Sequence, residues 1–199
     1  MKIGIDLDGV VFNSEMMFMA EGEIYDCRIL KRNSTLRPGE PRVQDKYDWS
    51  QEEIQGYVDR YCLSRAFDVM PCADKVIGYL QEAGHEIIVV SARGQFDPEE
   101  IEIAKEKLCE AGIRPDRTLW GHLDKRQVCL DLGLSVMIDD RYEVCQALSE
   151  MGVHTLYFRM AGRARVEENE YMKEVNNWGE VYRHLDRLGC FDGGSNEGN

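Results

Sequence analysis

Acidic residues stand in pairs at two places where a short apolar run of the sequence ends. The run near the N-terminus leads into Asp6 and Asp8, and the run at residues 135–138 is followed by Asp139 and Asp140. A pair of carboxylates at the end of a buried strand is unfavourable unless it has a partner. Mg²⁺ binds one or two protein carboxylates together with water and phosphate oxygens. The two acidic pairs therefore indicate a Mg²⁺ site.

Groups that can bind a phosphoryl group follow two other apolar runs. Ser91, Ala92 and Arg93 stand in a glycine-containing turn at the end of the second run, and Lys125 comes shortly after the third. A hydroxyl, a lysine and the backbone N–H groups of such a turn can position a phosphoryl group and neutralise its charge. A carboxylate directed at the phosphorus atom can act as the nucleophile. With the acidic pairs, these residues indicate phosphoryl-transfer chemistry.

The chain alternates between short apolar runs and segments with helical spacing. The runs, rich in β-branched residues, predict buried strands at residues 2–7, 86–91, 118–120, 135–138 and 154–158. Helical spacing with cap and stop signals predicts helices at residues 73–83, 98–111, 124–132 and 141–151. This alternation predicts an α/β fold, a Rossmann-like three-layer arrangement around one parallel sheet. Ligands bind beyond the carboxyl ends of such strands, so the residues named above are expected to meet there.

The stretch at residues 14–70 is too long for a plain crossover and has helical signals of its own. Ser50 and Glu53 form a capping-box signature, which predicts a helix that runs to about residue 65. The segment 33–48 contains one glycine and two prolines within four residues and is predicted to be a loop. We therefore expect a small helical subdomain at residues 14–70, inserted into a main domain formed by residues 1–13 and 71–188. Residues 189–199 are expected to form a flexible tail.

The inserted subdomain has two features that could serve a ligand. Between residues 28 and 46 it carries six basic residues and two acidic ones, which could attract an anion or could be a solvated face. Its aromatic residues and those just before it could stack on a nucleobase or form its own core: Phe12, Phe18, Tyr25, Tyr47, Trp49, Tyr57 and Tyr61. The helical spacing of Tyr57 and Tyr61 favours the core for that pair.

The composition argues against several classes of protein. The 199 residues, 43% of them hydrophobic, suffice for one domain with its own core. A formal charge of −13 repels phosphate backbones and anionic lipids, so neither a nucleic-acid polymer nor a membrane is expected as a partner. The N-terminal sequence does not resemble a signal peptide, and no apolar run approaches the roughly 18 residues of a membrane-spanning helix. Seven cysteines without a CxxC pair indicate reduced thiols and a cytoplasmic location.

The sequence resembles the haloacid dehalogenase (HAD) superfamily of phosphatases from its N-terminus to about residue 158. The similarity rests on four motifs in the order of that family: the DxDG signature that starts at Asp6, the motif II serine at Ser91, the motif III lysine at Lys125, and the acidic motif IV at Asp139 and Asp140. An ordered set of four motifs, each at a predicted strand end or helix start, is hard to obtain by chance.

The resemblance implies a role for each matching residue. Asp6 would be the nucleophile that forms an aspartyl-phosphate, and Asp8 the general acid and then the general base. Mg²⁺ would be bound by the carboxylates of Asp6 and Asp139 and by the backbone carbonyl of Asp8. The phosphoryl group would be bound by Ser91, the backbone of Ala92, and Lys125. Asp140 would orient water or Lys125, or bind the metal directly. Arg93 could contact a substrate phosphate or ribose, or pair with Asp97 or Glu99.

The resemblance also implies an activity, that of a Mg²⁺-dependent phosphomonoesterase. The insertion between the first two motifs corresponds to a cap of the C1 type, and its length most resembles the 5′(3′)-deoxyribonucleotidase and cytosolic 5′-nucleotidase branch. The expected substrate is therefore a (deoxy)nucleoside monophosphate. A phosphatase of a sugar phosphate or of another small phosphorylated metabolite is one alternative, and a non-catalytic module that binds a phosphorylated ligand is another.

Overall fold

A parallel sheet forms the centre of the protein. The computed structural model describes residues 1–33, 36–37, 40, 42–61, 68–95, 97–160 and 163–191. Within these residues six strands pair in the order β3-β2-β1-β4-β5-β6, all parallel. They are β1 (Lys2–Ile5), β2 (Glu86–Val90), β3 (Arg117–Leu119), β4 (Val136–Asp139), β5 (His154–Phe158) and β6 (Met172–Val175). The parallel sheet and the α/β class predicted from the sequence are confirmed.

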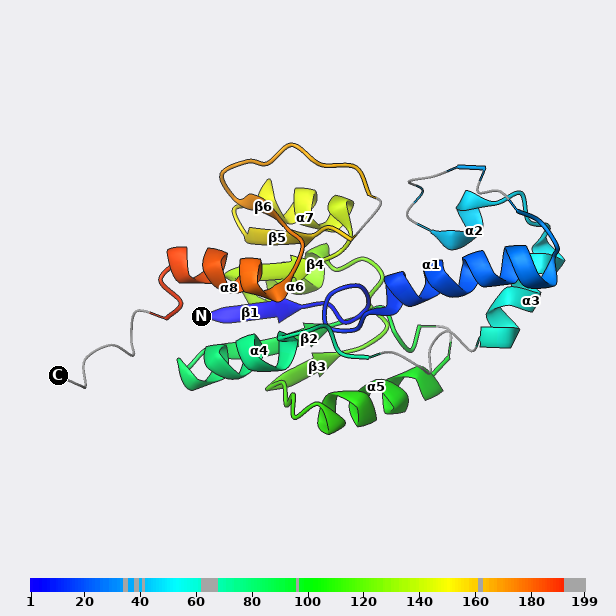
Figure 1. Cartoon of the computed structure of the whole chain (residues 1–199). Helices are drawn as coiled ribbons and strands as arrows, with labels where there is room; N and C mark the ends of the chain where they lie inside the picture. Colours follow the sequence, from blue (N-terminus) through cyan, green and yellow to red (C-terminus); the bar gives the residue numbers. More distant parts are fainter. Residues whose placement is uncertain are drawn as a thin grey trace.

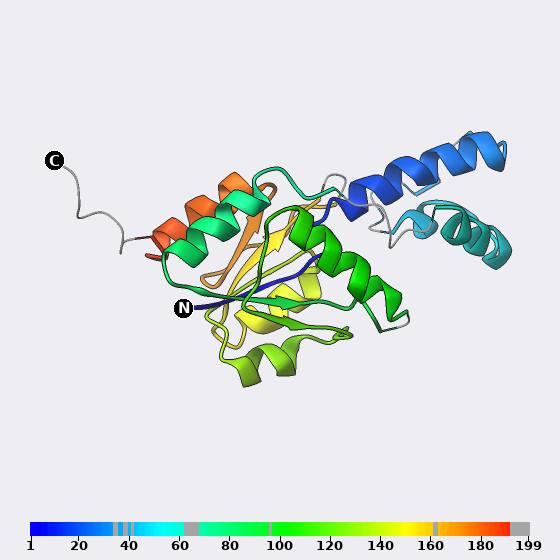
Figure 2. The ribbon, with the colours of Figure 1, turned by 90° about the horizontal axis from the view of Figure 1, so that it is seen from below.

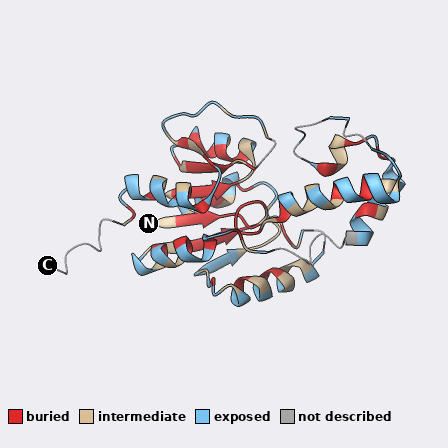
Figure 3. Cartoon of the chain, in the orientation of Figure 1, coloured by how far each residue is buried: buried red, intermediate tan, exposed pale blue. Residues whose placement is uncertain are grey.

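Both faces of the sheet are covered over its central strands, as the largely apolar sequences of β1, β2 and β4 require. The prediction of a buried strand at residues 118–120 is wrong in its burial, because β3 lies at the edge of the sheet and is mostly exposed. On β2, Ile87 and Val89 belong to one hydrophobic cluster, while Ile88 and Val90 belong to another, because successive side chains point to opposite faces. The central strands are accordingly buried along their length (Figure 3).

Helices form the two outer layers (Figure 2). The first cluster is completed by α4 (Ala73–Glu82), α5 (Glu99–Glu110) and α8 (Trp178–Arg187). The second is completed by α6 (Arg126–Leu132) and α7 (Tyr142–Ser149) on the other face. This arrangement leaves the carboxyl ends of the strands uncovered by the helices of the two layers.

A helical segment lies beyond those carboxyl ends (Figure 1). It consists of α1 (Ser14–Ile24), which continues into the π-helical turn η1 (Tyr25–Ile29), and of α2 (Val43–Lys46) and α3 (Gln51–Tyr61). The short helix α2 falls within residues 33–48, so the prediction that this whole stretch is a loop is wrong.

The capping box predicted at the start of α3 is confirmed. The backbone N–H of Glu53 donates to Ser50 Oγ at 3.2 Å, and the backbone N–H of Ser50 donates to Glu53 Oε2 at 2.7 Å. Two N–H groups that a helix start leaves without partners are thereby satisfied. The expected continuation to residue 65 lies partly outside the described residues.

Aromatic side chains form the core of the helical segment. Tyr47 stacks on Trp49 at a centroid distance of 4.7 Å, and Tyr25 and Tyr57 contact Trp49 at 5.3 and 5.2 Å. All four are buried. They pack together as the core of the segment, which is one of the two roles that the sequence leaves open for them. The side chain of Tyr61 lies outside the described residues.

Two elements near the C-terminus are missing from the sequence-based prediction. Strand β6 extends the sheet, and α8 packs Trp178, Val181 and Leu185 into the core. Past the helix, Cys190 is buried and the ring of Phe191 stacks on Tyr182 at 4.4 Å. The first residues of the predicted tail therefore pack against the rest of the chain, and residues 192–199 lie outside the described part.

The sequence predicts reduced thiols and contains no apolar run of the length of a membrane-spanning helix. The cysteines that the structure describes, six in number, are free. None of the described helices combines the length with the apolar character that crossing a membrane demands.

Candidate active site

A tight turn directly after β1 holds the first acidic pair at the carboxyl edge of the sheet. The carbonyl oxygen of Leu7 accepts hydrogen bonds from the N–H groups of Val10, Val11 and Phe12 at 2.8 to 3.2 Å. Helix α8 supports this turn from the side, since the indole N–H of Trp178 donates to the Val10 carbonyl at 2.8 Å. The turn therefore presents Asp6 and Asp8 from a rigid base.

Gly9 is required in this turn for two reasons. Its φ is +72°, in the left-handed region that glycine adopts without strain. A Cβ atom at this position would also lie 2.7 Å from Asp140 Oδ2, closer than any ordinary contact. The first and last acidic motifs are thus packed directly against each other.

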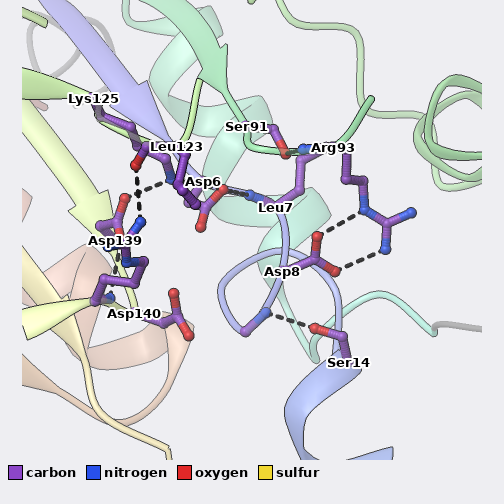
Figure 4. Close-up of polar contacts among 12 residues, drawn as sticks. Asp6, Leu7, Asp8, Ser14, Ser91, Arg93, Leu123, Lys125, Asp139 and Asp140 are labelled. Atoms are coloured by element: carbon purple, nitrogen blue, oxygen red, sulfur yellow. Dashed lines mark hydrogen bonds and ion pairs between the residues drawn. The ribbon is translucent and has the colours of Figure 1, made fainter. Parts of the chain in front are cut away.

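Lys125 joins two of the predicted carboxylates. Its ammonium nitrogen lies 2.9 Å from Asp6 Oδ1 and 2.7 Å from Asp139 Oδ2. The exposed fractions of the Lys125 and Asp139 side chains are 1% and 0%. Lys125 is at the N-cap position of α6, and β1 and β4 are neighbours in the sheet, so residues distant in sequence meet here (Figure 4).

Burial shapes the electrostatics of this group. Desolvation raises the pKa of Asp6 to about 7; the ammonium of Lys125 lowers this pKa, and the carboxylate of Asp139 raises it. For Lys125, burial disfavours the charged form, but the carboxylates of Asp139 and Asp6 together raise its pKa. One cation therefore stands among more acidic groups than it can neutralise.

The acidic cluster fits a divalent cation. Among the described residues, one carboxylate oxygen from each of Asp6, Asp139 and Asp140 lies within 4.8 Å of the other two. Burial, followed by the proximity of Asp139 and Asp6, raises the pKa of Asp140 well above its usual value. Oxygen ligands at this spacing suit Mg²⁺, whose charge would relieve their repulsion.

Asp139 accepts two hydrogen bonds with different oxygens. Oδ2 accepts from Lys125, and Oδ1 accepts from the backbone N–H of Arg141 at 2.9 Å. Arg141, and neither Asp139 nor Asp140, occupies the N-cap position of α7.

The second residue of the first motif is held by an arginine. Arg93 donates through Nε and Nη2 to the two carboxylate oxygens of Asp8, at 2.8 and 2.7 Å (Figure 4). This fork geometry is the strongest form of an arginine–carboxylate contact. The Arg93 side chain is 5% exposed and the Asp8 side chain 39%, so the pair is fixed from the protein side and open toward solvent.

Ser91 and Ala92 lie next to Arg93 in the turn that follows β2. The Ser91 side chain is buried, and its Oγ accepts a hydrogen bond from the Arg93 backbone N–H at 3.2 Å. The carbonyl of Ser91 accepts from the backbone N–H of His122, which connects this turn to the chain after β3. The turns after β2 and β3 are therefore linked near the site.

Sequence reasoning missed two charged residues at this edge. Arg163, which follows β5, donates to both carboxylate oxygens of Glu15 at 3.0 and 2.5 Å and to Asp140 Oδ2 at 3.0 Å. Its position after a parallel strand could have identified it as a candidate site residue, because the acidic pairs were located by the same rule that ligands bind beyond the carboxyl ends of the strands. For Glu15, in the first turn of α1, the sequence contains no comparable signal.

A cavity of about 320 Å³ lies between this edge and the helical segment. At one end it is lined by Asp8, Gly9, Glu15, Asp140 and Arg163. The helical segment contributes mostly apolar side chains with one cation and one amide: Phe18, Met19, Arg42, Val43, Gln44, Ile54, Tyr57 and Val58. The cavity therefore has an ionic end at the acidic motifs and a mainly apolar end under the helices.

Comparisons with known proteins identify the fold. No protein-family model and no curated protein matches the chain. Among solved structures, a predicted phosphatase from Clostridium acetobutylicum is similar with a TM-score of 0.58 at 17% identity, covering 94% of this chain and 98% of that one. A haloacid dehalogenase-like family hydrolase from Streptococcus pneumoniae is similar with a TM-score of 0.60 at 15% identity, covering 92% and 97%.

A third similar structure contains a ligand. It is a mutant of CbbY from Rhodobacter sphaeroides in complex with xylulose-(1,5)bisphosphate, with a TM-score of 0.54 at 15% identity, covering 90% of this chain and 95% of that one. All three likenesses extend over nearly the whole length of both chains. The chain has the fold of HAD-like hydrolases.

Proposed function

We propose that this chain is a Mg²⁺-dependent phosphomonoesterase that works through an aspartyl-phosphate on Asp6. The observation that carries this proposal is the largely buried group of Asp6, Lys125, Asp139 and Asp140. Asp140 of this group lines, together with Asp8, a cavity large enough for a small ester. A buried carboxylate whose pKa is raised, beside a cation-binding cluster and a cavity, is typical of a catalytic site.

Asp6 would attack the phosphorus atom. Its Oδ1 receives hydrogen bonds from Lys125 and from the backbone N–H of Leu7, the latter at 2.8 Å. These contacts fix the carboxylate, so we assign the attack to Oδ2. The P–O bond to Asp6 forms as the bond to the leaving oxygen breaks, which gives the enzyme-bound phosphate.

Asp8 would move the proton in both steps. It lines the cavity that would receive the leaving group, and it would protonate the leaving oxygen. It would then take a proton from the water that hydrolyses the aspartyl-phosphate. Arg93 would orient Asp8 through its two hydrogen bonds, so the contribution of Arg93 to phosphate binding is indirect.

The remaining residues would bind the phosphoryl group. The Ser91 hydroxyl, the Ala92 backbone N–H and the Lys125 ammonium supply donors and positive charge. Mg²⁺, bound by carboxylates of Asp6 and Asp139 and by the Asp8 carbonyl, would neutralise charge on the phosphoryl oxygens. Asp140, the third carboxylate of the acidic cluster, would orient Lys125 or a water molecule.

Residues 14–70 would act as a C1-type cap over a main domain formed by residues 1–13 and 71–188. Its apolar side chains would contact the leaving group and exclude water from the labile intermediate. A nucleoside, with a flat base and a sugar, suits a cavity of about 320 Å³ that is mainly apolar under the helices. We therefore propose a (deoxy)nucleoside monophosphate as the substrate.

A sugar phosphate is a second candidate substrate. It is favoured by the similar structure that contains xylulose-(1,5)bisphosphate. Arg42 and Gln44 in the cavity wall could serve hydroxyl or phosphate groups of such a ligand. Both candidates would use the same catalytic residues and differ in their contacts with the cap.

A substrate panel tests these proposals. Phosphate release from p-nitrophenyl phosphate with and without Mg²⁺ decides between an enzyme and a non-catalytic phospholigand-binding module. Comparing kcat/KM for deoxynucleoside and ribonucleoside monophosphates with pentose and hexose phosphates then assigns the substrate. Higher kcat/KM for a sugar phosphate than for every nucleotide would overturn the nucleotidase assignment, and absence of hydrolysis for the whole panel would overturn the phosphatase.

A further inference from the structure

Arg163 connects two parts of the molecule through one guanidinium group. It binds both oxygens of Glu15, at 3.0 and 2.5 Å, and Asp140 Oδ2 at 3.0 Å. It also donates to the backbone carbonyl of Asp140. A planar fork with five N–H donors can make all these contacts at once, which an ammonium group cannot.

The two partners of Arg163 belong to different structural units. Glu15 stands in the first turn of α1, where the chain leaves the sheet and enters the helical segment. Asp140 directly follows β4 and offers an oxygen to the acidic cluster with Asp6 and Asp139. Arg163 therefore links the base of the helical segment to the loop that carries motif IV.

This network is largely shielded from water. The side chains of Glu15, Asp140 and Arg163 are 10%, 14% and 16% exposed. Loss of the guanidinium would leave two neighbouring carboxylates without their shared cation, and such uncompensated buried charges are strongly unfavourable. The two carboxylates would then separate, which requires a shift of α1 or of the motif IV loop.

The same three residues line the cavity that opens onto Asp8. A ligand in the cavity would therefore contact the group that orients Asp140. Movement of Asp140 on cation binding at the acidic cluster would be transmitted to α1 through Arg163 and Glu15.

We propose that Arg163 is a positioning residue that couples the acidic cluster to helix α1, so that binding of Mg²⁺ at the cluster restrains the base of the helical segment. This inference rests on the proposed function, in that it takes the cluster to be a Mg²⁺ site. Arg163 acts through Asp140 and Glu15 and does not touch the reacting atoms.

Hydrogen exchange of the full-length chain with Mg²⁺ alone as the probe tests the coupling without any turnover. In the wild-type protein, Mg²⁺ should slow amide exchange in α1 by about 5-fold or more, the lower end of common coupling between sites. Arg163→Met should remove this slowing in α1 and keep the slowing at residues 136–140. Equal slowing of α1 in both proteins would overturn the proposal.

Two further variants keep the test decisive if Arg163→Met does not fold. Arg163→Lys keeps the positive charge but not the fork, and Glu15→Gln removes one end of the link. Each should lose most of the Mg²⁺-induced protection of α1. Arg126→Met, which removes an exposed arginine paired with Asp124, is the matched control and should behave as wild type.

Phosphatase kinetics on the same preparations separate this inference from the proposed function. With p-nitrophenyl phosphate, Arg163→Met should lower kcat more than it raises KM, and Arg163→Lys should restore part of kcat. An inactive wild-type protein would overturn the proposed function, whereas the exchange data would still decide whether Arg163 couples the two units.

Discussion

The side chains of Lys125 and Asp139 form an ion pair of 2.7 Å that is almost completely removed from water. Taking two charges out of water usually costs as much as their attraction returns, so such a pair is weak grounds for a role in stability. The same ammonium also contacts Asp6, which carries the attack in the proposed reaction. The pair is better explained as a preorganised positive charge at the place where a phosphoryl group would develop negative charge.

Replacing Asp6 by asparagine should abolish phosphatase activity. The amide cannot form the aspartyl-phosphate, so kcat should fall by about 10⁴-fold or more, as after loss of other catalytic nucleophiles. The chain should remain folded, because the amide keeps the shape of the carboxyl group. Steady-state kinetics with circular dichroism checks both points, and an Asp6→Asn protein of normal activity would exclude this nucleophile.

Replacing Asp8 by asparagine should have an effect that depends on the leaving group. Loss of general acid catalysis costs about 10²–10⁴-fold when an alkoxide must be protonated. The loss should be smaller for p-nitrophenyl phosphate, whose phenolate leaves without a proton. Comparing kcat/KM, which reports the step that expels the leaving group, for a nucleoside monophosphate and for p-nitrophenyl phosphate in the two proteins measures the difference. An equal loss of kcat/KM for both substrates would contradict the role of Asp8 as general acid.

The protonation of Asp6 should make the stability of the protein depend on pH, and stabilisation by Mg²⁺ should therefore increase with pH. The folded-state pKa of Asp6, about 7, lies above its ordinary value of 3.8, so between these values the folded chain keeps a proton that the unfolded chain has lost. The metal-free protein should therefore lose stability as pH rises through this window.

Mg²⁺ competes with the proton on Asp6, so its affinity should fall by about tenfold per pH unit below 7. The increase of Tm on addition of Mg²⁺ should accordingly be larger at pH 8 than at pH 5.5. Thermal unfolding with Mg²⁺ and with EDTA at both pH values measures this, and the Asp6→Asn protein is the control that should lose the dependence. A larger shift at the lower pH would contradict the assignment.

Replacing Gly9 by alanine should disturb the acidic cluster. The new Cβ would meet Asp140 Oδ2 at 2.7 Å, whereas at Gly84, with a φ of +81°, no heavy atom lies within 4 Å of such a Cβ. Both variants introduce a left-handed alanine, which costs about 1–2 kcal/mol. Only Gly9→Ala should also lose stabilisation by Mg²⁺ and catalytic activity. Equal activity of the two variants, measured beside their Tm values, would disprove the close packing of the motifs.

Enlarging Val58 should obstruct the cavity of the leaving group. Val58 is 42% exposed and lines the cavity, so tryptophan should be tolerated there. Val58→Trp should raise KM for a nucleoside monophosphate by about tenfold, the scale of a single misfit in an apolar pocket. Acetyl phosphate, with its small leaving group, should be unaffected, and Leu130→Trp on α6 is the exposed control. An unchanged KM for nucleotides would place the leaving group elsewhere.

The sequence by itself determined the α/β class and the four strand ends that carry chemistry. Apolar runs of three to six residues that alternate with helical segments are typical of strands in a parallel sheet, and parallel strands bring their carboxyl ends to one edge. For that reason Asp6, Ser91, Lys125 and Asp139 could be placed together without any coordinates.

The tertiary structure alone decided which charged groups are partners. The sequence leaves Asp97 and Glu99 open as partners of Arg93. The two hydrogen bonds from Arg93 to Asp8 depend on how the turns after β1 and β2 face each other. The contact of Arg163 with Glu15 joins residues 148 positions apart, and no local pattern encodes such a distance. Local periodicity specifies elements, but the partner of a buried charge is selected by the packing of elements remote in sequence.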